Sequence, residues 1–181
     1  MHPARLVIVG GLPGAGKTTR AIELADRFGA VRLSPDDWLE RLGIDIWDEG
    51  ARSRTERIQA DLTVDLLRIG ASVIIEWGTW MRSEREALRD SARRAGALVH
   101  LEFMDAPLDV LWERVRSRGR EQEVGARAIT RDDLVIWSDR VERPGDDELV
   151  GYDPLPPVVA GERPGSAGYP YGNCLPRSRV R

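Results

Sequence analysis

The 181-residue sequence is poor in cysteine and histidine, with only Cys174, His2 and His100. One cysteine cannot form an intrachain disulfide, and three such side chains do not suffice for a cysteine/histidine zinc cluster. The same scarcity disfavours a hydrolase built on a Ser-His-Asp or Cys-His arrangement.

A basic excess is also missing, because 27 lysines and arginines face 30 aspartates and glutamates, for a net charge of −3. This balance disfavours a nucleic-acid partner, although it leaves room for a local basic groove. No apolar run approaches the length of a membrane span, and the N-terminus lacks the layout of a signal peptide. We therefore expect a cytoplasmic protein without a membrane partner.

Short apolar runs alternate with helical periodicity along most of the chain. Strands are expected at residues 6–9, 31–33, 72–76 and 98–104. Helices are expected at residues 17–28, from 34 onward, at 51–69 with Ile58, Leu62, Leu66 and Ile69 along one side, and at 82–94, 107–118 and 132–141. Such alternation predicts an α/β fold, with a parallel sheet covered by helices on both faces.

The composition changes near the C-terminus, because prolines recur from Pro144 onward. There, only residues 155–159 offer a further short strand. Residues 161–181 have no period and little to bury, which is typical of a poorly ordered tail. We expect one domain over residues 1–160, followed by this tail.

A phosphate-binding loop lies between the first predicted strand and the first predicted helix, where the sequence matches G-x-x-x-x-G-K-[ST]. With the residue that follows, the loop comprises Gly11, Leu12, Pro13, Gly14, Ala15, Gly16, Lys17, Thr18 and Thr19. Its glycines let backbone amides approach phosphate oxygens, and the helix adds the positive end of its dipole. Lys17 supplies charge for the β- and γ-phosphates, and the Thr18 hydroxyl is a hard ligand suited to Mg²⁺. The sequence predicts binding of a nucleoside triphosphate, taken as ATP, with Mg²⁺.

Two acids, Asp36 and Asp37, follow the second predicted strand. The carboxyl ends of neighbouring strands share one crevice, so one of these side chains is expected to face the triphosphate. It can accept the proton of a substrate hydroxyl that attacks the γ-phosphate. Alternatively, both acids only favour the helix N-terminus, by about 0.3–1 kcal/mol each. We assign Asp36 as the general base and Asp37 to the helix cap.

These motifs, at residues 11–19 and 34–37, resemble those of small P-loop kinases in the AAA_33 and polynucleotide-kinase-like group. Zeta toxins and chloramphenicol phosphotransferases are more distant relatives of that group. The resemblance covers residues 6–148 and implies a three-layer α/β/α sandwich with a mostly parallel sheet. It also implies a short helical lid at about residues 119–131, and it assigns the base to the first aspartate of the pair, Asp36.

Glu76 closes the third predicted strand, where an acid suits a second magnesium shell or a substrate contact. The segment Glu76-Trp77-Gly78-Thr79 is similar to the Glu-Gly-Thr element of zeta toxins, with Trp77 as an extra residue. A solvent-exposed acid at a strand end is the alternative.

Arg114 and Arg118 are four residues apart and share one helical face. They precede a polar segment similar to the lid of small-molecule kinases, where arginines neutralise the transferring phosphate. Arg118 directly precedes the lid glycine and is our first choice, followed by Arg114 and then Arg127. A solvated charged face is the alternative.

Trp38, Trp77 and Trp80 follow the two strand ends that border the crevice. Tryptophans there can wall a pocket for a sugar or a base, or simply pack in the core. We keep Trp38 and Trp80, with Asp36 and Glu76, as candidate substrate residues.

The favoured function is an ATP-dependent kinase that phosphorylates a hydroxyl of a small molecule, with Lys17, Asp36 and Arg118 as catalytic residues. A polynucleotide 5′-hydroxyl kinase is the first alternative, which the acidic pI of about 5.5 disfavours. A nucleotide-dependent switch without an acceptor is the second. The sequence does not identify the acceptor.

Overall fold

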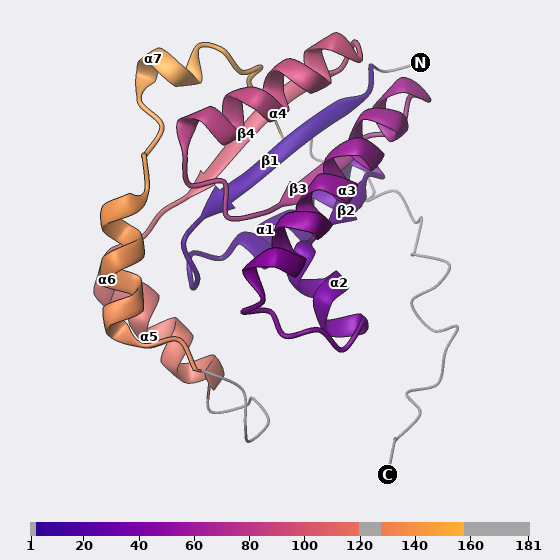
Figure 1. The fold of residues 1–181 in the computed structure, drawn as a ribbon. Helices are drawn as coiled ribbons and strands as arrows, with labels where there is room; N and C mark the ends of the chain where they lie inside the picture. Colours follow the sequence, from indigo (N-terminus) through magenta and orange to yellow (C-terminus); the bar gives the residue numbers. More distant parts are fainter. Residues whose placement is uncertain (1–2, 120–127, 158–181) are drawn as a thin grey trace.

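A parallel sheet of four strands forms the centre of the computed structural model, which describes residues 3–119 and 128–157 (Figure 1). The strands are β1 (Arg5–Gly11), β2 (Val31–Leu33), β3 (Val73–Glu76) and β4 (Leu98–Met104), in the order β2-β3-β1-β4. Leu6 on β1 is paired with Val73 on one side and Val99 on the other. The predicted parallel sheet is confirmed.

The helices alternate with the strands up to β4 and then follow one another. They are α1 (Lys17–Phe28), α2 (Pro35–Arg41), α3 (Glu49–Arg68), α4 (Arg82–Arg94), α5 (Leu108–Gly119), α6 (Arg131–Arg140) and α7 (Asp146–Leu149). Ser34 caps α2 by accepting a hydrogen bond from the amide of Asp37 at 3.4 Å, and Pro35 occupies its first turn. Of the helices in the described part, none is long and apolar enough to span a bilayer.

The sheet is buried on both faces by different helices. On one face, Val7 and Val9 pack against Ala21 and Leu24 of α1. On the other face, the β1 residues Leu6 and Ile8 belong to a cluster that α3 and α4 complete through Leu67 and Ala92. The arrangement is the expected three-layer α/β/α sandwich.

A third apolar cluster lies beyond the carboxyl end of β1, where α5 and α6 lie side by side in Figure 1. It joins Leu12 and Ala15 of the phosphate-binding loop to Leu111 of α5 and Leu134 of α6. The loop is therefore packed on both helices that flank the predicted lid.

Some expectations need correction or lie outside the described residues. In α3, Ile58 and Ile69 are exposed, at 58% and 79%, and the buried line consists of Ala51, Thr55, Gln59, Thr63 and Leu67. Residues 155–157 do not form the expected strand, and 158–159 are not described. The tail from 161 and residues 120–127 of the lid also lie outside the described ranges.

Candidate active site

The phosphate-binding loop has a backbone that only glycine accommodates at its start and middle. Gly11 has a φ of +130°, and a Cβ there would collide with the carbonyl oxygen of Met104. Gly14 has a φ of +84°, and a Cβ would lie 2.7 Å from the carbonyl oxygen of Leu111. The loop thus packs directly against the carboxyl end of β4 and against α5.

Lys17 lies at the first position of α1, with its ammonium 3.1 Å from the carbonyl oxygen of Leu12. Burial lowers the pKa of Lys17 from 10.5 to about 8. The carboxylates of Glu76 and Asp36 act in the opposite direction and raise this pKa. Glu76 and Asp36 are therefore close enough to Lys17 to interact with it electrostatically.

Thr18 and Glu76 meet across the gap between α1 and β3. The Thr18 hydroxyl donates to Oε1 of Glu76, and Arg32 of β2 donates to Oε2. Glu76 is only 8% exposed, so the alternative of a solvent-exposed strand end does not apply to it. Arg32 also donates to Asp37 and so connects β2, β3 and the start of α2.

A hydroxyl and a carboxylate at this position fit a magnesium ion held mainly by phosphate oxygens. Among the described residues, no group of three or more His, Cys, Asp or Glu side chains can hold a metal by itself. Thr18 would be the direct ligand, and Glu76 would orient it or a water molecule.

Asp36 lies in the first turn of α2, where its Oδ1 accepts a hydrogen bond from Arg52 of α3. Its side chain is 62% exposed, whereas that of Asp37 is 34% exposed and turned to Arg32. Arg52 also lies 3.9 Å from Glu56, one turn along α3. Of the pair Asp36 and Asp37, Asp36 is the one whose charge raises the pKa of Lys17.

The two predicted lid arginines lie beside the phosphate loop. Arg114 donates to the carbonyl oxygen of Gly14 at 3.2 Å, and the charge of Arg118 lowers the pKa of Lys17. Both line a hollow of about 390 Å³ whose other walls are Gly14, Ala15, Gly16, Thr19, Arg20, Glu23 and Met104. Arg127 lies outside the described residues.

The candidate substrate tryptophans lie in different surroundings. Trp38 packs against the apolar cluster that includes Leu33 and Ile75, which favours a packing role. The Trp80 indole donates to the carbonyl oxygen of Gly11 at 3.4 Å, so it contacts the loop itself. Their contribution to substrate binding stays a prediction.

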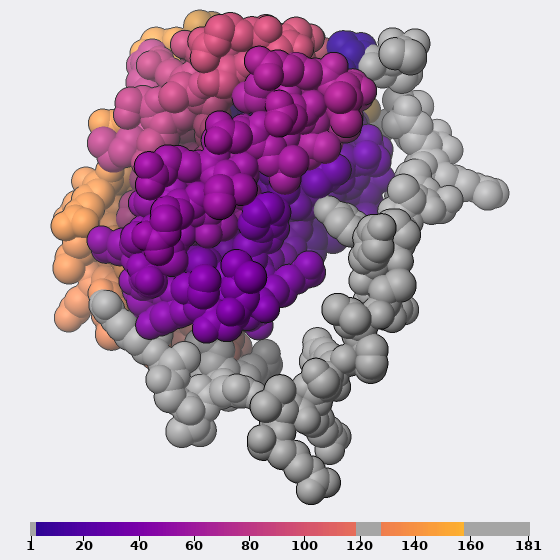
Figure 2. Space-filling model, turned by 45° about the vertical axis from the view of Figure 1, so that its right-hand side comes forward, coloured from indigo at the N-terminus to yellow at the C-terminus, as the bar shows by residue number. Residues whose placement is uncertain are grey.

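Trp47 and Trp137 extend the aromatic surface in a way that the sequence did not suggest. Trp137 of α6 lies 5.7 Å from Trp80 and 6.1 Å from Trp47, between ring centroids. Trp47 belongs to the connection between α2 and α3, and Figure 2 shows the purple surface of that region meeting the orange surface of α6. The three rings connect the α2–α3 connection, α6 and the turn after β3.

Arg32 and Arg52 were also missed. An arginine between Val31 and Leu33 in a strand of a parallel sheet is a signal that could have identified Arg32, since such strands are normally apolar. Arg52 gives no comparable signal, because one more arginine in a charged helix is usually solvated. Its contact with Asp36 depends on the packing of α3 against α2.

The comparison with protein families decides the identity of the fold. The model of AAA_33, described as an AAA domain, matches residues 6–135. The chain belongs to the AAA_33 family. The resemblance drawn from the phosphate loop and the acids of α2 is thereby confirmed.

Two curated relatives of this AAA_33 chain differ in length. A Synechococcus sp. (strain CC9311) protein named adenylate kinase is 31% identical over 150 residues, covering 73% of this chain and 78% of that protein. An uncharacterized Mycobacterium tuberculosis (strain H37Rv) protein is 34% identical over 131 residues, covering 63% of this chain. The chain spans only 26% of the length of that mycobacterial relative.

Solved structures give the same P-loop kinase fold. A Chloroflexus aurantiacus protein with the provisional description of a kinase is 26% identical with a TM-score of 0.64, covering 80% of this chain and 83% of that one. A sugar kinase from Janibacter sp. HTCC2649 is 26% identical with a TM-score of 0.55, covering 80% and 82%. The chain thus has the fold of P-loop kinases.

Proposed function

We propose that this protein transfers the γ-phosphate of ATP to a hydroxyl of a small molecule, with Asp36 as the general base. The observation that supports it most is the position of the Asp36 carboxylate, in the first turn of α2 just after β2 and within electrostatic reach of Lys17. A carboxylate close to the lysine of the phosphate loop is what a hydroxyl acceptor needs, because its proton must leave as the oxygen attacks.

The donor half of the reaction belongs to the phosphate loop and to α5. Loop amides and Lys17 would bind the β- and γ-phosphates. Thr18, oriented by Glu76, would hold Mg²⁺, which supplies neutralisation of phosphate charge when bound. Arg114 and Arg118 border the hollow beside the loop. There they neutralise the charge that spreads over the equatorial oxygens during transfer.

The acceptor half belongs to α2 and α3. The acceptor oxygen forms a bond to the γ-phosphorus while the bond to the bridging oxygen of ADP breaks, and the hydroxyl proton passes to Asp36. Arg52 binds Oδ1 of Asp36 and so fixes the direction of the carboxylate. An acceptor that is already a phosphate carries its own negative charge and needs no base, so Asp36 favours a hydroxyl.

A transfer assay with γ-labelled ATP and Mg²⁺ tests this proposal against its alternatives. The panel contains sugars, nucleosides, aminoglycosides and a 5′-hydroxyl oligonucleotide. We expect label in one class of small hydroxyl compound. Label in the oligonucleotide would favour a polynucleotide 5′-hydroxyl kinase, and release of inorganic phosphate alone across the panel would favour a nucleotide switch.

A further inference from the structure

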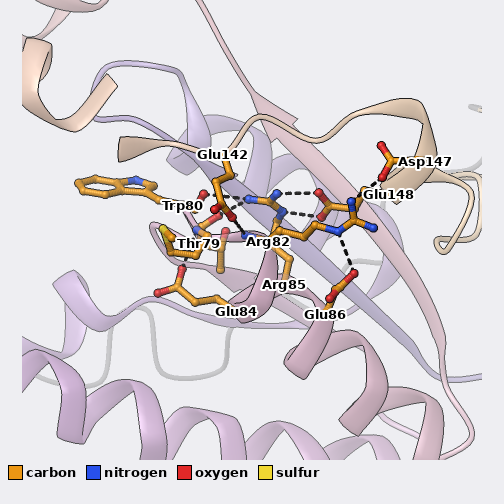
Figure 3. A network of polar contacts seen from close by, with 10 residues as sticks. Thr79, Trp80, Arg82, Glu84, Arg85, Glu86, Glu142, Asp147 and Glu148 are labelled. Carbon is orange, nitrogen blue, oxygen red and sulfur yellow. Dashed lines mark hydrogen bonds and ion pairs between the residues drawn. The ribbon is translucent and has the colours of Figure 1, made fainter. Parts of the chain in front are cut away.

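A buried ion pair joins Arg85 of α4 to Glu148 of α7 (Figure 3). The side chains of Arg85 and Glu148 are 0% and 2% exposed. Nε and Nη2 of Arg85 donate to the two carboxylate oxygens of Glu148, each at 2.7 Å. Apolar residues of similar volume often serve stability equally well, so a buried pair points to a role in specifying a conformation.

The third nitrogen of Arg85 holds the turn that follows β3. Its Nη1 donates to the carbonyl oxygens of Thr79 and Trp80, both at 3.1 Å. Thr79 has a φ of +40°, the only positive φ of a non-glycine among the described residues. A β-branched residue is strained in that region, and the strain persists only where the surroundings enforce it.

The turn forms hydrogen bonds with both the amide and the carbonyl oxygen of Gly11, the first residue of the phosphate loop. The amide of Gly11 donates to the carbonyl oxygen of Gly78 at 3.2 Å, and the indole of Trp80 donates to the carbonyl oxygen of Gly11 at 3.4 Å. Gly10 lies so close to the Thr79 hydroxyl that a Cβ on it would collide. A displaced turn would therefore displace the start of the loop.

We propose that Arg85 and Glu148 are positioning residues for the phosphate loop. Through the strained turn at residues 78–80 they hold Gly11 in the conformation that binds Mg·ATP. The inference rests on the proposed function, in which this loop binds Mg·ATP. The turn at residues 78–80 also connects the loop to the segment after α6, because the amide of Glu142 donates to the carbonyl oxygen of Trp80 at 3.0 Å.

The double variant Arg85→Met/Glu148→Leu separates positioning from folding, because it leaves no unpaired buried charge. We expect a urea unfolding midpoint close to that of the wild type and a Kd for Mg·ATP about tenfold weaker, measured by calorimetry. Arg82→Gln is the matched control, since Arg82 is the neighbouring arginine of α4 and pairs at the surface with Glu86 and Asp147. Its Kd should equal that of the wild type.

A double-mutant cycle with Trp80→Phe distinguishes positioning from general loosening. Trp80→Phe removes the donor to Gly11 and should weaken Mg·ATP binding in the wild type, with little further effect in the double variant. Additive losses, or an unchanged Kd in the folded double variant, would overturn the inference.

If the double variant unfolds, Arg85→Lys takes its place, because lysine keeps the charge but not the fork that reaches Glu148 and both carbonyls. An unchanged Kd in folded Arg85→Lys would overturn the inference equally. Absence of Mg·ATP binding in the wild type would refute the proposed function, and with it the inference.

Discussion

At the scale of single residues, burial determines the charge that Lys17 can offer to a triphosphate. Burial lowers the pKa of Lys17 to about 8 in the structure without nucleotide, and bound phosphates raise it again through their opposite charge. Below this pKa the ammonium is already formed, so affinity is independent of Lys17 titration there. Above it, binding must protonate the amine, so affinity falls as pH rises.

We therefore expect Mg·ATP binding to take up a proton above pH 8, and its affinity to decline as the pH rises further. Calorimetry in two buffers of different ionisation enthalpy measures the uptake directly. Lys17→Arg is the control, because its guanidinium does not titrate in this range and the uptake should disappear. Equal uptake by both proteins would assign the proton to another group.

Residue types at fixed spacing were enough to predict the loop and the acids of α2 and β3. Lys17, Thr18, Asp36 and Glu76 lie within one region because the carboxyl ends of parallel strands meet there. Arg85 could not be predicted in this way. The sequence of α4 suggests a charged surface helix, and only the later packing of α7 buries this one arginine.

At the scale of elements, the connection between α2 and α3 is held against α6 by aromatic contacts. Trp137 contacts Trp47 on one side and Trp80 on the other. Each such aromatic pair contributes about 0.5–1.5 kcal/mol beyond its burial. Opening of the acceptor side of the crevice should therefore involve residues 42–48 and α6 together.

Trp137→Ala tests this coupling by hydrogen exchange. Amide exchange should accelerate about tenfold both in residues 42–48 and in α6, while α1 stays unchanged. Ile136→Ala on the same helix, where the isoleucine is 49% exposed, should change neither segment. Acceleration confined to α6 would contradict a contact between the two sides.

Periodicity predicted the long elements well and the short or polar ones poorly. The helices α1, α3, α4, α5 and α6 occur close to their expected bounds, and α2 begins where it was expected, because apolar spacing, caps and glycine stops act locally. The four residues of α7 are too few for a periodic signal. In α3 the buried line carries Thr55, Gln59 and Thr63, which a search for apolar side chains overlooks.

At the scale of the whole molecule, stability depends on a central strand that is covered on both faces. Ile8 of β1 is fully buried beneath α3 and α4. Ile8→Ala should lower the free energy of unfolding by about 2–5 kcal/mol, measured with urea. Ile22→Ala on α1, where the side chain is 46% exposed, should change it by less than about 0.5 kcal/mol. Similar losses for both would mean that β1 is not the core of the fold.

In the proposed function, the molecule brings a triphosphate and a carboxylate base to one crevice. This proposal is tested most directly by comparing wild type with Asp36→Asn for label transfer to the acceptor found in the panel. Asp37→Asn serves as the control, because Asp37 is assigned to the helix cap and pairs with Arg32. We predict an unchanged Kd for Mg·ATP in Asp36→Asn with transfer about 10²–10⁴-fold slower, and near-normal transfer in Asp37→Asn. Transfer at the wild-type rate by Asp36→Asn would show that Asp36 is not the general base.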